Sequence, residues 1–327
     1  MTGLSDSFQR PINYLRVAVT DRCNLRCVYC MPEEGVPWMP HSNILSYEEI
    51  HTIVKAAAEM GITRVRLTGG EPLVRAGIVD FVKMLSGIKE LEDISMTTNG
   101  IFLAKHAVDL KNAGLSRVNV SLDTLKPERF KKICRGGDIN EVLNGIETAM
   151  TVGLKPVKIN MVVMLGVNDD EILDFARKTI DQEWNVRFIE LMPFTGHNGQ
   201  TPKGLTAREI KKRLDPIGKM EPTMPSRGNG PAKYYRFPDA KGTIGFITAL
   251  SEHFCFSCNR LRLTADGKLR PCLMSEQMLD LREPLRGGIS QQQLKDLIQQ
   301  AVTAKPMGHH LEEGQRPNDR PFCQVGG

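Results

Sequence analysis

Residues 15–30 of this chain read LRVAVTDRCNLRCVYC, a strand-like run that leads directly into three cysteines. Cys23, Cys27 and Cys30 are separated by three residues and then by two, and no fourth cysteine lies nearby. Three thiolates at this spacing suit one iron–sulfur cluster, which normally takes four protein thiolates. The pattern therefore predicts a cluster in which one iron stays open for a ligand that is not part of the protein.

Two other uses of these cysteines stay open. One is a partial zinc site, although structural zinc prefers four ligands in paired, separated Cys-x2-Cys knuckles, and this loop contains no histidine. The other is a disulfide framework, which is typical of short, cysteine-dense chains, whereas this chain has 8 cysteines in 327 residues. The cluster is the interpretation that fits the spacing best.

The composition is that of an ordinary globular protein, with 41% hydrophobic residues and a net charge of +5. The longest apolar stretches, such as residues 53–60, are far shorter than the roughly 20 residues that a bilayer span needs. The charge excess is too small to indicate nucleic acid, and we interpret Lys131, Lys132 and Arg135 as a solvated helix face. Because no apolar secretory segment opens the chain, we expect a cytoplasmic protein with reduced thiols.

Short β-branched runs alternate with helix-like stretches up to about residue 192. The expected strands are residues 15–20, 64–68, 93–97, 117–122, 156–163 and 186–192, and the expected helices are residues 47–60, 77–88, 105–113, 141–152 and 171–180. This alternation requires parallel strands joined by right-handed crossovers. We predict an α/β fold, an incomplete (βα)6 TIM-like barrel over residues 1–200. A doubly wound sheet is the alternative, but no Gly-x-Gly-x-x-Gly follows the first strand.

Polar or glycine-rich motifs follow one expected strand after another. They are Thr-Gly-Gly-Glu-Pro at 68–72, Thr-Thr-Asn-Gly at 97–100, Ser-Leu-Asp at 121–123 and Met192. Each motif alone is an ordinary turn or helix start. The active site of a barrel, however, is built from the loops at the carboxyl ends of its strands. Together with the cysteine loop, the motifs therefore indicate one active site.

Glycine and proline become frequent after residue 193, which indicates a smaller C-terminal α+β region over residues 201–327 with a helix at 206–214. Cys255, Cys258 and Cys272 lie in this region, again without a fourth cysteine close by. A zinc site is the alternative here too, but a zinc ribbon needs a second Cys-x2-Cys. We expect a second cluster with an open iron.

Cationic residues occur at strand positions where apolar residues would be expected. They are Arg16, Arg66, Lys158, Arg187, Arg260 and Arg262. Residues two apart on a strand share a face, so Arg260 and Arg262 point in the same direction beside the second cysteine set. Guanidinium groups bind phosphate and carboxylate through paired hydrogen bonds. The alternative is a set of isolated surface groups. The pattern favours an anionic substrate, most simply a triphosphate.

The combined motifs resemble the GTP 3′,8-cyclase family of radical S-adenosylmethionine (SAM) enzymes, which carries out the first step of molybdenum cofactor biosynthesis. The resemblance covers nearly the whole chain, including Cys-Asn-Arg-Leu-Arg-Leu-Thr at 258–264 and the terminal Gly326-Gly327. It implies a barrel of the radical SAM type, SAM as cofactor and two [4Fe–4S] clusters. The first would be held by Cys23, Cys27 and Cys30, and the second by Cys255, Cys258 and Cys272, with its open iron on the guanine ring.

The resemblance also implies roles for single residues. Contacts to SAM are expected from Tyr29, Gly70, Ser121 and Met192. Contacts to GTP are expected from Arg16, Arg66, Thr97, Lys158, Arg260, Leu261 and Arg262. Catalysis is expected to depend on Arg16, Arg260, Arg262, Gly326 and Gly327, although glycine-ended termini are commonly frayed. No role is assigned to Cys134 or Cys323.

In this family a 5′-deoxyadenosyl radical from SAM removes hydrogen from C3′ of GTP, and the carbon radical attacks C8. Reduction gives (8S)-3′,8-cyclo-7,8-dihydroguanosine 5′-triphosphate. The resemblance further implies a homodimer and cyclic pyranopterin monophosphate synthase as the next enzyme. From the small net charge and the short apolar stretches we expect no nucleic acid or membrane partner. Two rival functions are a radical SAM peptide modifier with an auxiliary cluster and a zinc-binding interaction protein.

Overall fold

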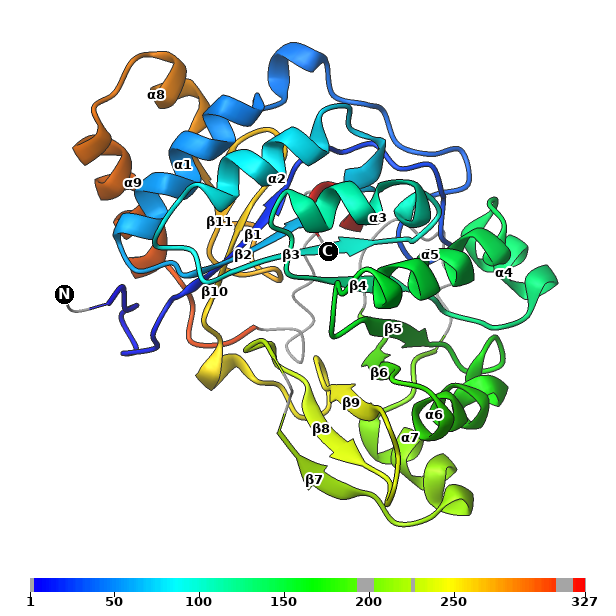
Figure 1. Ribbon diagram of the computed structural model, residues 1–327. Coiled ribbons are helices and arrows are strands. Elements are labelled where there is room, and N and C mark those ends of the chain that lie inside the picture. Colours follow the sequence, from blue (N-terminus) through cyan, green and yellow to red (C-terminus); the bar gives the residue numbers. More distant parts are fainter. Residues whose placement is uncertain (1–2, 193–202, 225–226, 310–319, 327) are drawn as a thin grey trace.

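A single β-sheet organises the computed structural model, which describes residues 3–192, 203–224, 227–309 and 320–326 (Figure 1). Within these residues the strand order is β12-β11-β10-β1-β2-β3-β4-β5-β6-β9-β8-β7. The strands are β1 Tyr14–Ala18, β2 Arg64–Thr68, β3 Asp93–Thr98, β4 Arg117–Ser121, β5 Lys158–Val163, β6 Asn185–Glu190, β7 Glu221–Thr223, β8 Lys233–Arg236, β9 Thr243–Ile247, β10 Arg260–Leu263, β11 Lys268–Arg270 and β12 Leu279–Asp280. The pairs from β10 through β9 are parallel, and the outer strands are antiparallel.

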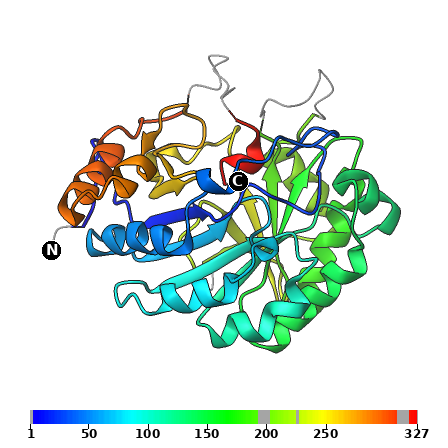
Figure 2. The ribbon, with the colours of Figure 1, turned by 90° about the horizontal axis from the view of Figure 1, so that it is seen from above.

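Helices cover the outer face of this curved sheet, and the space on its inner side is here called the lumen (Figure 1, Figure 2). They are α1 Tyr47–Glu59, α2 Ile78–Ser86, α3 Leu103–Asn112, α4 Pro127–Cys134, α5 Ile139–Thr151, α6 Ile172–Asp181, α7 Ala207–Leu214, α8 Arg282–Arg286 and α9 Gln291–Thr303. Local signals set their starts. Ser46 and Glu49 form a capping box at α1, and Asp138 caps α5. Among the described helices, none is long and apolar enough to span a bilayer.

The two faces of the parallel strands differ in character. Val17, Leu67 and Ile159 are fully buried and belong to the apolar core. Their strand neighbours Arg16 and Lys158 alternate with them and therefore lie on the opposite face. Burying the outward apolar residues under the helices stabilises the fold, at about 25 cal/mol for each Å² removed from water. The inner face is left for polar side chains.

The C-terminal region contributes strands to both edges of the six-stranded unit. β9 pairs with β6, and β10 pairs with β1, both in parallel. Residues 248–259 connect these two strands, and β9 and β10 are not neighbours in the sheet order. The described barrel is therefore incomplete, as predicted, and the connecting segment lies between its two open edges. The division at residue 200 stays a prediction.

Candidate active site

The first cysteine loop follows β1 and is held by backbone hydrogen bonds on two sides. Arg26 N donates to the carbonyl of Cys134 and Val28 N to that of Ile133, both over 2.9 Å, so the end of α4 supports one side. On the other side, Gly70 N donates to the carbonyl of Thr20 over 2.8 Å. The loop is thus fixed between α4 and the Gly-Gly-Glu-Pro segment.

Close backbone approach explains the glycine at position 70. A Cβ atom there would lie 2.1 Å from the carbonyl oxygen of Arg22, which no real Cβ contact allows. The next residue, Glu71, is buried and accepts hydrogen bonds from Thr98 Oγ1 at 2.8 Å and Asn99 N at 2.6 Å. Burial raises the pKa of this carboxyl to about 7. Glu71 therefore joins the loops that follow β2 and β3.

A second carboxyl, that of Asp123 in the loop after β4, joins the cysteine loop to strand β5. Tyr29 Oη donates to Asp123 Oδ2 over 2.7 Å, and Val162 N donates to Asp123 Oδ1 over 2.8 Å. Burial raises the pKa of Asp123 to about 6. Ser121 ends β4 in register with Asn160, and Met192 lies two residues beyond β6. The structure brings the predicted SAM-contacting residues to the same end of the sheet.

Cys23, Cys27 and Cys30 are half-buried free thiols that interact electrostatically. Burial raises the pKa of Cys23 to about 12. Thiols that resist ionisation become thiolates when a metal replaces their protons. In the part of the chain that is described, no three His, Cys, Asp or Glu side chains converge on a single ion. Cluster thiolates need no such convergence, since each binds a different iron, so this donor set fits an iron–sulfur cluster.

Two further cysteines contact this set, which the sequence did not indicate. Cys134, at the end of α4, hydrogen-bonds Cys27, and this contact, with burial, raises the pKa of Cys27. Cys323 is 2% exposed and hydrogen-bonds Cys30. The sequence separations carry no signal for these contacts. Both buried thiols therefore pack against the expected cluster ligands.

The second cysteine set lies at the opposite end of the lumen. Cys255 and Cys258 immediately precede β10, whose parallel partner β1 runs away from them toward the first cysteine loop. Cys272 follows β11, which is antiparallel to β10 and returns to the same end. Burial and the other two thiols raise the pKa of Cys255. The two predicted cluster sites therefore face each other along the strands.

Buried cations line the lumen between these two sites. Arg262, Arg16 and Arg66 occupy one level on the neighbouring strands β10, β1 and β2. Burial lowers the pKa of Arg66 and of Arg262 to about 10 each. For Lys158, burial and then the nearby Arg187, Arg117 and Arg66 lower the pKa to about 6. Like charges gathered in a buried space favour an anionic ligand.

Polar atoms in the lumen also lack partners. Within the described residues, buried Tyr14 Oη, Asn160 Oδ1 and Arg187 Nε make no hydrogen bond. Unsatisfied buried polar atoms are rare in native proteins and mark places where a ligand or water binds. Arg117, which sequence reasoning missed, is 1% exposed and pairs with Asp93. Its place inside an expected strand was a usable signal, as it was for Arg66.

The last described residues lie against the inner side of β1, β2 and β10 (Figure 2). The carbonyl of Gly326 accepts hydrogen bonds from Arg16 Nε at 3.2 Å and Arg262 Nη1 at 3.4 Å. Gly326 has φ of +70°, and a Cβ there would meet Ala18 Cβ at 3.3 Å. Gly327 lies outside the described residues. The structure thus places one of the two predicted glycines against two predicted arginines.

The remaining predicted substrate contacts differ in where they lie. Thr97 Oγ1 accepts a hydrogen bond from Asn119 Nδ2 at 3.5 Å, and this pair lies on the lumen side of β3 and β4. Arg260 Nη2 lies 3.8 Å from Cys258 Sγ. The side chain of Leu261 belongs to the apolar core. The structure therefore does not place the Leu261 side chain on the lumen side.

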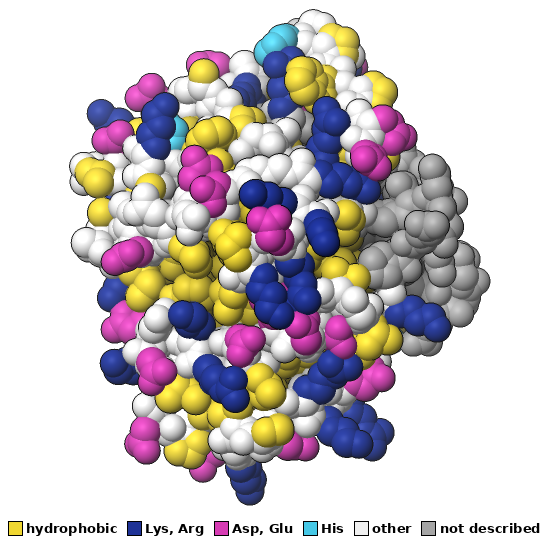
Figure 3. Space-filling model, turned by 90° about the vertical axis from the view of Figure 1, so that its right-hand side faces the viewer, with side chains coloured by type: hydrophobic (Ala, Val, Ile, Leu, Met, Phe, Trp, Pro, Cys, Tyr) yellow, Lys and Arg dark blue, Asp and Glu magenta, His cyan; other side chains and the backbone are white. Residues whose placement is uncertain are grey.

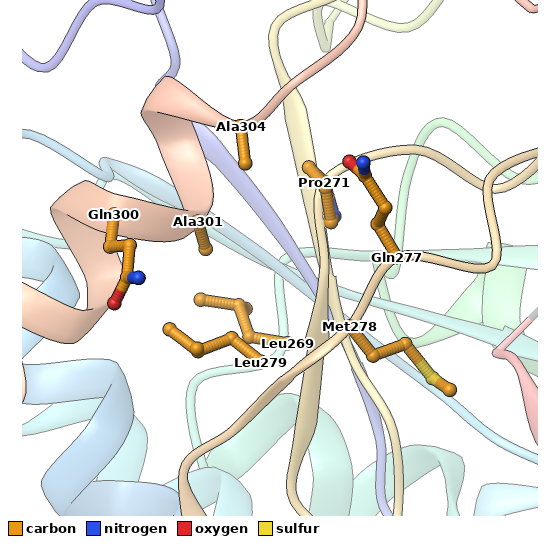
Figure 4. A pocket seen from close by; sticks show the side chains of 8 residues that line it. All are labelled: Leu269, Pro271, Gln277, Met278, Leu279, Gln300, Ala301 and Ala304. Atoms are coloured by element: carbon orange, nitrogen blue, oxygen red, sulfur yellow. The ribbon is translucent and has the colours of Figure 1, made fainter.

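Outside the lumen, a surface pocket beside α6 is lined by charged side chains, among them Asp174, Arg177 and Lys178. An apolar pocket between α9 and β11–β12 is lined by Leu269, Leu279 and Ala301 and by no charged side chain (Figure 4). On the face drawn in Figure 3, basic and acidic side chains are interspersed. The titratable groups and unsatisfied polar atoms described above concentrate in the lumen instead.

Comparisons with known proteins show the family of the chain. The Radical SAM superfamily model matches residues 17–179, and the Molybdenum Cofactor Synthesis C model matches residues 184–311. GTP 3′,8-cyclase from Heliobacterium modesticaldum is 53% identical over 98% of this chain and 99% of its own length. The enzyme of that name from Moorella thermoacetica is 52% identical over 99% of this chain and 100% of its own.

Among solved structures, Streptococcus suis SuiB bound to S-adenosylmethionine has a TM-score of 0.62 at 16% sequence identity. The match covers 83% of this chain and 64% of that chain, and it supports the fold alone. Fold and cysteine loop together define a radical SAM protein. The extent and identity of the sequence matches are more specific: the chain belongs to the GTP 3′,8-cyclase family.

Proposed function

We propose that this chain converts GTP to (8S)-3′,8-cyclo-7,8-dihydroguanosine 5′-triphosphate, using SAM as the radical source, in molybdenum cofactor biosynthesis. One observation carries the proposal beyond family membership. Two three-cysteine sets lie at opposite ends of a lumen whose inner wall is cationic. A radical source at one end and a nucleotide held from the other end require this arrangement.

We assign one cluster to Cys23, Cys27 and Cys30, and a second to Cys255, Cys258 and Cys272. When bound, the first cluster supplies the electron that cleaves SAM, and the second holds the guanine ring. Tyr29, Gly70, Ser121 and Met192 end neighbouring strands or loops around the first set, which suits contacts to SAM. The protein itself provides position, charge and enclosure.

The triphosphate is assigned to the lumen cations. Three arginines lie at one level on three adjacent strands, and each guanidinium group can bind phosphate through paired hydrogen bonds. Lys158 adds an ammonium group from β5. The predicted set for GTP is Arg16, Arg66, Thr97, Lys158, Arg260, Leu261 through its backbone, and Arg262. Holding the phosphates and the base at separate points fixes the ribose between them.

Enclosure matters because a carbon radical must not meet solvent. Arg66 and Lys158 are 7% and 4% exposed, and the tail at Gly326 reaches the lumen beside Ala18 and Thr68. A water-poor site strengthens the electrostatic contacts and limits side reactions. We assign to Gly326 and Gly327 the role of closing the site over the bound nucleotide.

Anaerobic reconstitution with iron and sulfide, followed by incubation with SAM and a reductant, tests the proposal. We expect about eight irons per chain, and 5′-deoxyadenosine formation that GTP stimulates and ATP does not. ATP is the matched control because it has the same triphosphate and ribose but a different base. A colourless zinc protein, or peptide-dependent SAM cleavage, would instead favour one of the two rival functions.

We extend the proposal to the setting of the enzyme. Its eight cysteines are all free thiols, which suits the reducing cytoplasm. We expect a homodimer, with GTP as the substrate and cyclic pyranopterin monophosphate synthase as the next enzyme. Sedimentation of the reconstituted protein tests the dimer.

A further inference from the structure

Lys305 is a buried lysine just beyond α9, outside all the motifs discussed above. Lys305 is only 3% exposed. The Nζ atom donates to the carbonyl of Arg260 over 2.8 Å and to that of Pro271 over 2.6 Å. Pro271 directly precedes Cys272, and Arg260 follows Cys258 by two residues. One ammonium group thus joins the two separate backbone segments that carry the second cysteine set.

The charge of Lys305 has no acidic partner within the described part of the chain. The ion pairs recorded there include Lys295 with Glu59, but none that involves Lys305. Burying an unpaired ammonium group is costly, and native proteins offset the cost with opposite charge. The Nζ atom of Lys305 lies instead between the two backbone segments that carry Cys258 and Cys272.

Arg10 also contacts the second cysteine site, but its positive charge is compensated by an acidic residue. Arg10 donates to the carbonyls of Cys255 at 2.6 Å and Met307 at 2.9 Å, so it supports the same site from outside. Its charge, however, is paired with Asp6 at 2.6 Å. Lys305 therefore brings net positive charge to the cysteine set, whereas Arg10 brings a neutral pair.

We propose that Lys305 is a positioning residue of the second cluster site. Its ammonium group holds the segments around Cys258 and Cys272 together and places an uncompensated positive charge beside their thiolates. A cluster held by three thiolates is anionic and becomes more so on reduction, so it supplies the charge that Lys305 lacks. This inference rests on the proposed function only in that the second set holds a cluster.

The same contact reaches the substrate side of the site. The carbonyl of Arg260 belongs to the first residue of β10, which carries Arg260 and Arg262 into the lumen. Holding that carbonyl fixes where β10 starts next to the second cysteine set. Lys305 therefore connects the position of the cluster with the position of two predicted nucleotide contacts.

The experiment measures the second cluster directly, without turnover. Full-length protein with Cys23, Cys27 and Cys30 replaced by serine isolates the second cluster for a redox titration followed by electron paramagnetic resonance. In this background, K305M should shift the midpoint potential downward. The variant lacks the positive charge that stabilises the more negative, reduced cluster. K305R should restore a potential near that of the parent. K295M is the matched control, since Lys295 is a solvent-accessible lysine on α9 paired with Glu59, and it should cause no shift.

Each outcome decides the matter. A K305M protein with the parent's potential overturns the inference, and so does an equal shift in K295M. If K305M fails to retain the cluster, K305R decides: retention with the parent's potential supports the role of the charge, and loss contradicts it. A parent that binds no second cluster overturns this inference together with the two-cluster assignment. A parent with both clusters and no GTP-dependent chemistry overturns the proposed function alone.

Discussion

Arg16 Nε donates a hydrogen bond to the carbonyl of Gly326 over 3.2 Å, which joins the first strand of the sheet to the last described residue. Arg262 reaches the same carbonyl at 3.4 Å from the neighbouring strand. Two arginines that are predicted to bind GTP thus donate hydrogen bonds to the protein's own C-terminal segment. The tail and a nucleotide would share these donors, which makes the tail sensitive to small changes.

Gly326→Ala should abolish most GTP-dependent SAM cleavage while both clusters are retained. The added methyl group would lie 3.3 Å from Ala18 Cβ and 3.4 Å from Thr68 Cγ2, at a φ of +70° that costs an L-residue about 1–2 kcal/mol. The tail would then leave its place beside Arg16. Iron content and 5′-deoxyadenosine formation are the measurements. Gly288→Ala is the control, because Gly288 has a φ of +80° with nothing within 4 Å. Equal activity losses in both variants would contradict a specific role of the tail.

Binding of GTP should take up a proton at Lys158 near pH 7.5. Its pKa is lowered to about 6 by burial and by neighbouring arginines, so the free site is largely neutral at that pH. A bound triphosphate favours the charged form and raises the pKa. Anaerobic titration calorimetry in two buffers of different ionisation enthalpy measures the uptake. Lys158→Met should remove it and weaken binding, whereas buffer-independent heats for the parent would refute the assignment.

The same group should make folding stability depend on pH. The pKa of Lys158 is about 6 when folded and near 10.5 when unfolded, so the unfolded chain binds more protons between these values. Stability from this group is therefore lowest below pH 6 and rises as the pH increases toward 10.5. Comparing the pH dependence of unfolding for the parent and Lys158→Met isolates this contribution. The slope of the unfolding free energy against pH should be smaller in the variant, by an amount that corresponds to at most one proton.

Arg262→Met should weaken GTP binding by roughly 10- to 100-fold, the cost of one or two charge-assisted hydrogen bonds. Both clusters should stay in place.

Arg260→Met should weaken GTP binding and also make the second cluster more sensitive to acid. Burial raises the pKa of Cys258, but Arg260 and then Lys305 outweigh it and hold the pKa at about 6. Without Arg260 the thiol protonates more readily, so the second cluster should be lost at a higher pH on acidification. Arg236→Met, at an exposed position of β8, is the control. Identical behaviour of the Arg260 and Arg262 variants would contradict the distinction.

Gly70→Ala should remove the first cluster and spare the second. The Cβ would lie 2.1 Å from the Arg22 carbonyl, so the cysteine loop must move away from the Gly-Gly-Glu-Pro segment. Overpacking of this kind typically costs about 1–3 kcal/mol. Iron analysis should fall to about four irons per chain, with no SAM cleavage. Gly3→Ala, with nothing within 4 Å of its Cβ, should keep the parent's iron content. A Gly70→Ala protein with both clusters would show that the loop can adapt.

The strands were predictable because apolar and polar side chains alternate along them, one kind on each face of the sheet. In β2, apolar Val65 and Leu67 alternate with Arg66, and the strand has the expected bounds of 64–68. Helix α4, Pro127–Cys134, is absent from the expected alternation, because it has only 8 residues and Arg135 and two glycines follow it. The interpretation of Lys131 and Lys132 as a solvated helix face is nevertheless confirmed, since both lie exposed on α4. The pairing of β10 with β1 joins residues about 246 positions apart and depends on long-range packing that no local pattern records.

The site shows the same division between local and distant information. Cys23, Cys27, Cys30 and the motifs after each strand could be placed at one end from their positions alone, because parallel strands end together. The side chain of Leu261 packs in the core, which its apolar character already suggested. The contact between Cys323 and Cys30 and the contact of Lys305 with two carbonyls arise from chain segments that meet only in the folded structure.

The alternation along β1 and β2 separates two tasks that the same few residues perform. Val17 and Leu67 pack in the apolar core, whereas Arg16 and Arg66 lie on the opposite face of the same strands. Substitutions on the inner side can therefore alter which molecule is accepted without disturbing the packing that keeps the protein folded. The inner positions of these two strands are therefore the ones to vary when a different ligand is to be bound.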